Sequence, residues 1–263
     1  MQNYLNNSYP QGRGGLNLPY LILFSLIALT GLFSTAYAQL PAAEIIAKVD
    51  AIRSPQEDYV TTTEITSYSL NRKPKTALYQ VMIKGTDNTI IKTLQPETER
   101  NRILLLRGHD LWAFFPEVSK PLRLSLQERL MGEVSNGDIA RVNFLGDYDA
   151  KLLKEELLDG KNCFVLELIA KTEDVTYAKA ILWAEVETFH PIKAEFYAVS
   201  GKLLKNCFYQ NYQILAGCLR PTELVLEDPI TKGKNSIIRY NSIELQELPE
   251  KYFMKDYMKK MME

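Results

Sequence analysis

Alternating apolar and polar residues along most of the chain predict a fold built mainly from β-strands. Tyr59 to Leu70 is rich in β-branched and aromatic residues, and Tyr79, Val81 and Ile83 alternate with other residues in the next run. Asp159-Gly160 separates two later runs, and this dipeptide is typical of a two-residue hairpin turn. The pattern predicts an antiparallel meander of about eleven strands joined by short turns.

Helical spacing of apolar residues occurs in three places. Pro41 to Arg53 has an apolar face, and Glu250 to Met262 is a short helical tail that carries lysines and methionines. Between them, Ser125 to Gly132 has helical spacing, and residues 135–138 form a turn or N-cap cluster. We interpret residues 125–145 as an insertion of short helices. A sheet of this length must be covered or must curl, so we expect these helices to cover its apolar face.

The first 38 residues have the features of a secretory signal peptide. Arg13 precedes the apolar run from Leu21 to Phe33, and Ala36-Tyr37-Ala38 provides a small-x-small cleavage site. The apolar run is shorter than the roughly 20 residues that cross a bilayer, although an uncleaved signal anchor is the alternative. We expect cleavage after Ala38, secretion into the periplasm, and one mature domain over residues 39–263.

Charge and cysteine content leave several partners open. The 263-residue chain has a formal net charge of −1, so no basic excess indicates nucleic acid as a partner. No cysteine directly follows the cleavage site, so the protein is not expected to be a lipoprotein itself. Cys207 and Cys218 are candidates for a disulfide between neighbouring strands, with Cys163 left over. Three buried thiols are an equally good interpretation.

Motifs that carry catalysis or bind metals are not found in the sequence. It has only two histidines, His109 and His190, so we expect no metal site built on imidazole, no cofactor and no catalytic centre. Asp138 lies in the non-strand insertion, where a cap or turn role is the simplest interpretation. A hydrolase built on Asp138 and His109 is the least supported alternative.

A family resemblance rests on a block of motifs between residues 101 and 148, with weaker pieces later in the chain. The block contains NRILLL (101–106), LWAFFP (111–116), RLMG (129–132), SNGDIA (135–140) and DY (147–148). The later pieces are ETFHP (187–191), EFY (195–197), SGKLLK (200–205) and RP (220–221). Together they resemble the LolA-like group of secreted proteins, often called outer-membrane lipoprotein-sorting proteins. The resemblance covers nearly the whole mature chain and is nearer to a poorly characterised branch than to the classical carrier.

The resemblance implies an unclosed, strongly curved antiparallel sheet, a half-barrel whose concave side is covered by helices and holds acyl chains. Each buried methylene contributes about 0.8 kcal/mol, so such a carrier needs a dry apolar slot and no catalytic motif. In the classical carrier, a lid arginine helps to switch between closed and open states. Here Arg53, Arg72, Arg129 and Arg141 are candidates for that role by charge alone.

We therefore predict a monomeric periplasmic carrier for lipoprotein acyl chains or another lipid, which contributes to outer-membrane lipoprotein sorting or lipid transport. The candidate slot residues are apolar or aromatic: Trp112, Phe114, Leu130, Met131, Phe144, Trp183 and Phe196. Asp138 and Arg129, in the insertion, form the candidate gate. The alternative is an envelope accessory or sensor protein that works with an inner-membrane transporter and docks through its tail, residues 250–262.

Overall fold

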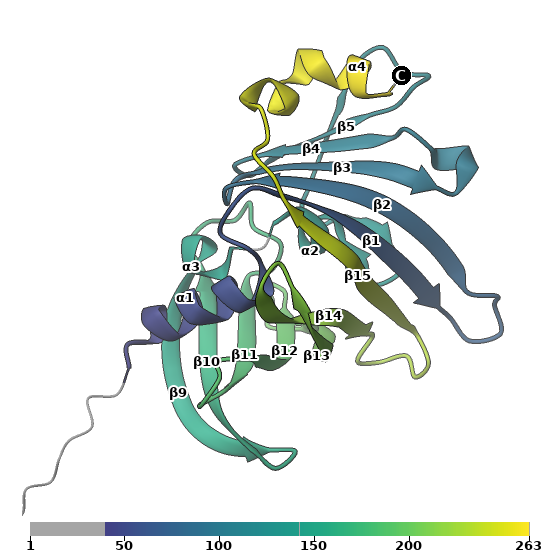
Figure 1. Ribbon diagram of the computed structural model, residues 1–263. Helices are drawn as coiled ribbons and strands as arrows, with labels where there is room; N and C mark the ends of the chain where they lie inside the picture. Colours follow the sequence, from purple (N-terminus) through teal and green to yellow (C-terminus); the bar gives the residue numbers. More distant parts are fainter. Residues whose placement is uncertain (1–39, 142, 263) are drawn as a thin grey trace, which may run out of the picture. The chain divides into compact units, whose positions relative to one another are not determined.

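The computed structural model describes residues 40–141 and 143–262. The expected signal peptide lies outside these described residues. Within them, thirteen strands form one antiparallel sheet and two further strands form a hairpin (Figure 1). The sheet strands are β1 (Tyr59–Tyr68), β2 (Lys75–Lys84), β3 (Asn88–Gln95), β4 (Ile103–Arg107), β5 (Asp110–Phe114), β6 (Leu122–Leu124), β9 (Tyr148–Leu158), β10 (Lys161–Ala170), β11 (Lys179–Glu185), β12 (Pro191–Tyr197), β13 (Leu203–Leu215), β14 (Cys218–Glu227) and β15 (Asn235–Leu245).

The sheet is two meanders joined where the first strand pairs with the last. Its order is β6-β5-β4-β3-β2-β1-β15-β14-β13-β12-β11-β10-β9, so β6 and β9 remain as edges and the sheet is not closed. This confirms the expected unclosed antiparallel sheet. The number of strands is larger than eleven because strands of two or three residues, such as β6, are too short for alternation to identify them.

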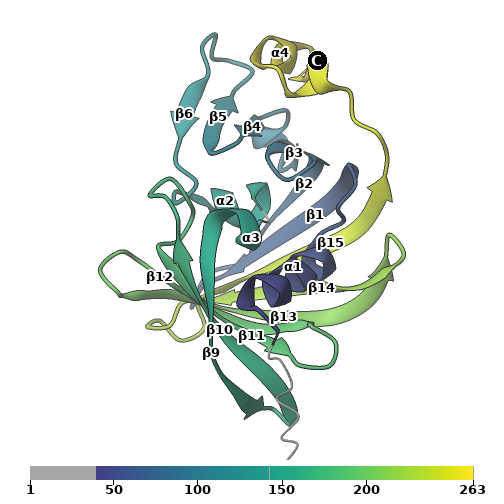
Figure 2. The same cartoon turned by 90° about the vertical axis from the view of Figure 1, so that its left-hand side faces the viewer.

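Local sequence explains two of the confirmed elements. Asp159 and Gly160 have φ angles of 49° and 81°, as a primed hairpin turn between β9 and β10 requires. Helix α1 (Ala42–Arg53) buries its apolar face completely, through Ile45, Ile46 and Val49. It contacts β9 and β14 and lies inside the curve of the sheet (Figure 2).

The expected helix at residues 125–132 is wrong. Strand β7 (Arg129–Met131) occupies this segment and pairs with β8 (Val134–Ser135) around Gly132. Gly132 has a φ of +56°, and a Cβ there would collide with two serine hydroxyl groups, so the tight turn requires glycine. The hairpin competes successfully with helix formation because it packs against the ends of β1 and β15, a tertiary contact that periodicity cannot reveal.

Two short helices follow this hairpin and confirm the rest of the expected insertion. They are α2 (Asn136–Ala140) and α3 (Phe144–Asp147). Ser135 and Asp138 form a reciprocal capping box at the start of α2, so the expected cap role of Asp138 is confirmed. We call residues 125–141 and 143–147 the plug. The plug helices and α1 lie on the concave side of the sheet (Figure 2).

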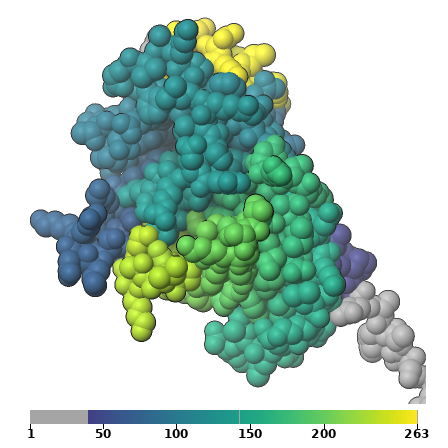
Figure 3. Space-filling view, turned by 180° about the vertical axis from the view of Figure 1, so that it is seen from behind, coloured from purple at the N-terminus to yellow at the C-terminus, as the bar shows by residue number. Residues whose placement is uncertain are grey.

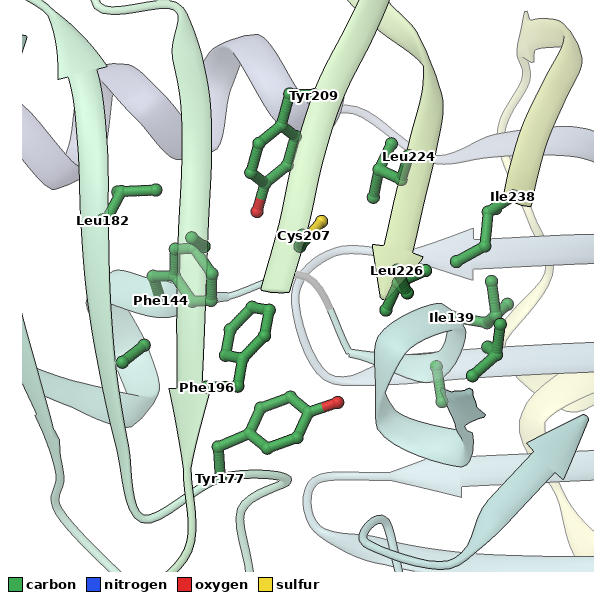
Figure 4. Packing of buried hydrophobic residues seen from close by; sticks show 14 of the residues in the cluster. Ile139, Phe144, Tyr177, Leu182, Phe196, Cys207, Tyr209, Leu224, Leu226 and Ile238 are labelled. Atoms are coloured by element: carbon green, nitrogen blue, oxygen red, sulfur yellow. The ribbon is translucent and has the colours of Figure 1, made fainter. Parts of the chain in front are cut away.

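Two apolar clusters occupy the two faces of the sheet. The larger cluster lies between the concave face and the helices (Figure 4). The smaller one is formed by the tail, which comprises the 3-10 helices η2 (Glu250–Phe253) and η3 (Lys255–Tyr257) and helix α4 (Met258–Met262), and by residues of β3 to β5. Phe253 and Met258 are fully buried there. In Figure 3 the tail, in yellow, lies beside the first strands of the sheet, in blue and teal.

The three cysteines are free thiols. In the β13–β14 pairing, Cys207 lies opposite Leu226 and Cys218 lies opposite Leu215, so the two cysteines are at different levels of the hairpin. Burial raises the pKa of the Cys207 thiol to about 12. Cys207 therefore behaves as a small apolar residue of the core, which is one of the two interpretations that the sequence left open.

Candidate functional site

A small cavity, which we call the closed cavity because it is too small for a ligand, lies between the concave face and the plug. Its volume is about 30 Å³, which is room for about one or two water molecules. Apolar side chains line part of it, namely Phe144, Phe196, Leu224, Leu226 and Ile238 (Figure 4). Polar and charged side chains line the rest, namely Arg53, Asp138, Arg141, Asn143, Asp147 and Thr176. The ring of Phe196 stacks on Tyr177, with 4.3 Å between the ring centroids. The lining therefore combines an apolar wall, mostly from the sheet, with charged residues of α1 and the plug.

A larger cavity of about 370 Å³ lies next to this one, between the β7–β8 hairpin and the turn that joins β12 to β13. Its lining includes Arg129, Glu133, Ser200 and Lys205. Tyr177 contributes to the lining of both cavities. The Tyr177 side chain therefore stands at the boundary between the apolar interior and the outer cavity.

A buried ion pair fastens the plug at this boundary. Lys205 Nζ lies 3.0 Å from Asp138 Oδ2, and the two side chains are only 6% and 8% exposed. The Tyr177 hydroxyl donates to Asp138 Oδ1 at 2.6 Å, and Lys205 also donates to Ser135 Oγ at 3.2 Å and to the Glu133 carbonyl. Burial, with the Asp138 carboxylate beside it, raises the pKa of Tyr177 well above its usual value. Tyr177 therefore stays protonated and acts as a donor.

A second buried ion pair joins the two plug helices, and its arginine also binds the sheet. Arg141 Nε and Nη2 each lie 2.6 Å from an oxygen of Asp147, which is the bidentate geometry that guanidinium groups favour. Arg141 Nη1 also donates to Asp87 and to the Gly108 carbonyl, both at 3.0 Å. Burial opposes the charge of Arg141, but the Asp147 carboxylate more than offsets it, so the pKa of Arg141 is raised. The plug is thus tied to the turns that follow β2 and β4.

The histidine and aspartate considered for hydrolysis are not brought together. His109 lies 3.2 Å from both Asp147 and Asp174, whereas Asp138 binds Lys205 and Tyr177. Within residues 40–141 and 143–262, no cluster of three or more histidine, cysteine or acidic side chains is arranged to hold a metal ion. No helix in the described part of the chain is long and apolar enough to cross a membrane.

Known structures share this arrangement of sheet and plug. The LolA superfamily protein NE2245 from Nitrosomonas europaea is 43% identical, with a TM-score of 0.80, and the match covers 83% of this chain and 100% of that one. The chain belongs to the LolA superfamily. A family model described as "Uncharacterized protein" also matches residues 85–260. Among curated proteins, none matches the chain.

More distant structures show the same fold. A DUF1329 family protein from Desulfovibrio piger is 22% identical, with a TM-score of 0.71, over 82% of this chain and 97% of that one. A putative outer membrane lipoprotein-sorting protein domain from Vibrio parahaemolyticus is 24% identical, with a TM-score of 0.70, over 83% of this chain and 98% of that one. At these identities the comparison shows the fold alone.

Four of the seven candidate slot residues lie on the concave side of this LolA-superfamily sheet. Phe144 and Phe196 line the closed cavity. Leu130 and Met131, from β7, pack against the same apolar cluster. Of the candidate gate residues, Asp138 lies in the buried ion pair, and Arg129 is mostly exposed and lines the outer cavity.

The other three candidate slot residues lie on the opposite face of the sheet. Trp112 and Phe114 pack in the tail cluster, where Lys255 Nζ lies 3.1 Å from the centre of a Trp112 ring. Trp183 alternates with the buried core residues of β11 and donates from Nε1 to Glu156 Oε1 at 2.6 Å. Because the tail buries part of the convex face and long side chains partly cover Trp183, apolar residues alone do not identify the concave face.

Several residues that line the closed cavity were not predicted from the sequence. Tyr177, Tyr209, Leu224 and Leu226 reach it from β13, β14 and the loop before β11. Tyr209 shares a face of β13 with the buried Cys207 and Lys205. The alternation of residues along this strand could therefore have predicted that Tyr209 faces the interior.

Proposed function

We propose that the protein is a periplasmic lipid carrier that holds acyl chains between the concave face of the sheet and the plug. The observation that supports this proposal best is the set of aromatic and aliphatic side chains on the concave face, Phe196, Leu224 and Leu226 among them, beneath a plug that polar contacts fasten to the sheet. Transfer of each methylene from water to such a lining contributes about 0.8 kcal/mol, without any catalytic group. Membership of the LolA superfamily favours the same role.

Loading requires the plug to move. The closed cavity of about 30 Å³ is far smaller than the roughly 300–1,000 Å³ of typical ligand sites. Separation of Lys205 from Asp138 would join the interior to the outer cavity through the position of Tyr177. We therefore propose Asp138 as a gate residue and Arg129 as a residue of the entrance. The remaining proposals are cleavage after Ala38, a monomeric state and a binding role rather than catalysis.

Uptake of a fluorescent fatty acid tests the carrier function. Phe196→Trp and Leu226→Trp add bulk to the closed cavity, and we expect each to reduce the amount bound at saturation. Trp183→Phe, on the opposite face, is the matched control and should bind as the parent protein does. Native mass spectrometry of protein purified from its own envelope should show bound lipid or acylated peptide. Absence of both lipid and uptake would contradict the proposal.

The accessory or sensor alternative relied on a tail that is free to dock with a partner. The tail is instead packed on its own sheet through Phe253 and Met258, both fully buried. We therefore favour the carrier. Deletion of residues 250–263 separates the two functions: loss of lipid uptake would mark the tail as part of the carrier fold. Loss of a partner pull-down with uptake intact would favour the accessory role.

A further inference from the structure

A third cavity, of about 20 Å³, lies between β1, β15 and the end of α1 and has an unusual lining. Two arginines, Arg53 and Arg220, contribute to it, and none of its described lining residues is an aspartate or glutamate. Thr61 and Thr63, on the concave face of β1, also line it and are 3% and 0% exposed. The cavity therefore combines buried positive charge with buried hydroxyl groups.

Several of the polar groups around this cavity lack a hydrogen-bond partner among the described residues. Among the described residues, the hydroxyl groups of Thr61 and Thr63 have no hydrogen-bond partner. Arg53 donates from Nη1 to Asp50 at 2.9 Å, and no other hydrogen bond of its five N–H groups is found within the described residues. A buried donor without an acceptor costs free energy, so an acceptor from outside that bonded to these groups would recover that cost.

The local charge favours an anion as that acceptor. Asp50 is the carboxylate that neutralises Arg53, whose guanidinium also stacks 3.7 Å from the centre of the Phe144 ring. Arg220 donates to the carbonyl groups of Ala51 and Ile52, at 2.6 and 2.9 Å, which leaves its full positive charge. Two guanidinium groups therefore face one carboxylate in a region of low dielectric constant.

We propose that this cavity is the subsite for the carboxylate head group of a fatty acid, bound by Arg53 and by the Thr61 and Thr63 hydroxyls. A planar carboxylate matches the paired N–H groups of a guanidinium. It is also small, so the cavity needs to enlarge only a little to hold it. Ile139, from α2 of the plug, also lines the cavity, so movement of the plug would enlarge it. The subsite rests on the proposed carrier function, because the acyl chain would continue into the apolar interior.

The test compares palmitate with hexadecanol, which has the same chain and no charge. We expect the parent protein to bind palmitate at least tenfold more tightly, in a fluorescent-ligand displacement assay. Thr61→Val and Thr63→Val keep the shape of the side chain and remove an unpaired hydroxyl, so they should not lower protein stability. Each should weaken palmitate binding about tenfold, the value of one hydrogen bond to a charged group, and leave hexadecanol unchanged.

The outcomes separate this subsite from the carrier function. Arg53→Gln should abolish the preference for palmitate; if this variant does not fold, the two valine variants still decide. Equal binding of palmitate and hexadecanol by the parent protein would overturn the subsite and leave the carrier standing. Unchanged palmitate binding by both valine variants would overturn it as well. Failure of the parent protein to bind either compound would contradict the carrier function itself.

Discussion

The buried ion pair between Lys205 and Asp138 is the clearest place to perturb the plug. At 3.0 Å and an effective dielectric constant of about 20, the attraction between the two charges is about 5–6 kcal/mol. Desolvation offsets much of this, but removal of one partner leaves the other charge buried and unpaired. We expect Lys205→Met and Asp138→Asn each to lower the free energy of unfolding by about 3–5 kcal/mol.

The double variant distinguishes an ion pair from two independent contacts. Lys205→Met combined with Asp138→Asn leaves no unpaired charge. The double variant should therefore lose less free energy of unfolding than the sum of the two single variants, by at least about 2 kcal/mol. Urea unfolding measures all four proteins. The single variants should also load fatty acid faster, because the plug opens more easily. Additive losses, or single losses below about 1 kcal/mol, would refute the reasoning.

Three further predictions concern the tail, the plug turn and acid stability. Phe253→Ala should lower the free energy of unfolding by about 3–5 kcal/mol in urea, since this side chain is fully buried. Gly132→Ala should lower the free energy of unfolding clearly more than Gly201→Ala does. Both glycines have positive φ, but of the two only Gly132 has other atoms where a Cβ would lie. Hydrogen bonds from Lys234 and from two backbone N–H groups lower the pKa of Asp228 from 3.8 to about 2. The ionised Asp228 therefore stabilises the folded state, and this contribution is lost as the pH falls from about 4 to about 2. Asp228→Asn should flatten the dependence of Tm on pH there, and an unchanged slope would contradict this.

The elements that the sequence predicted correctly depend on short-range rules. The Asp159-Gly160 turn follows from the need for positive φ at two successive residues, and α1 follows from its apolar face. The segment from Ser125 to Gly132 was predicted wrongly because its hairpin depends on contacts with distant strands. The pairing of β1 with β15, which holds the two meanders together, is equally invisible to local patterns.

The candidate site was predicted only in part, for a different physical reason. The plug and α1 cover the concave face, and the tail covers the other face around β3 to β5, so aromatic residues are at least half-buried on either side. Phe144 and Phe196 fall on the concave side, whereas Trp112 and Trp183 fall on the other. The partner of Asp138 is Lys205, 67 residues away in the sequence, and no spacing rule links them.

Labelling with a photoreactive fatty acid tests the central claim most directly, because it reports which face of the sheet the acyl chain touches. After irradiation and digestion, mass spectrometry should locate the label on peptides that carry Phe144, Phe196 or Tyr209, which line the interior. Excess palmitate should suppress this labelling. Labelling confined to the Trp112 and Trp183 face, or labelling that palmitate does not suppress, would contradict an interior acyl-chain site.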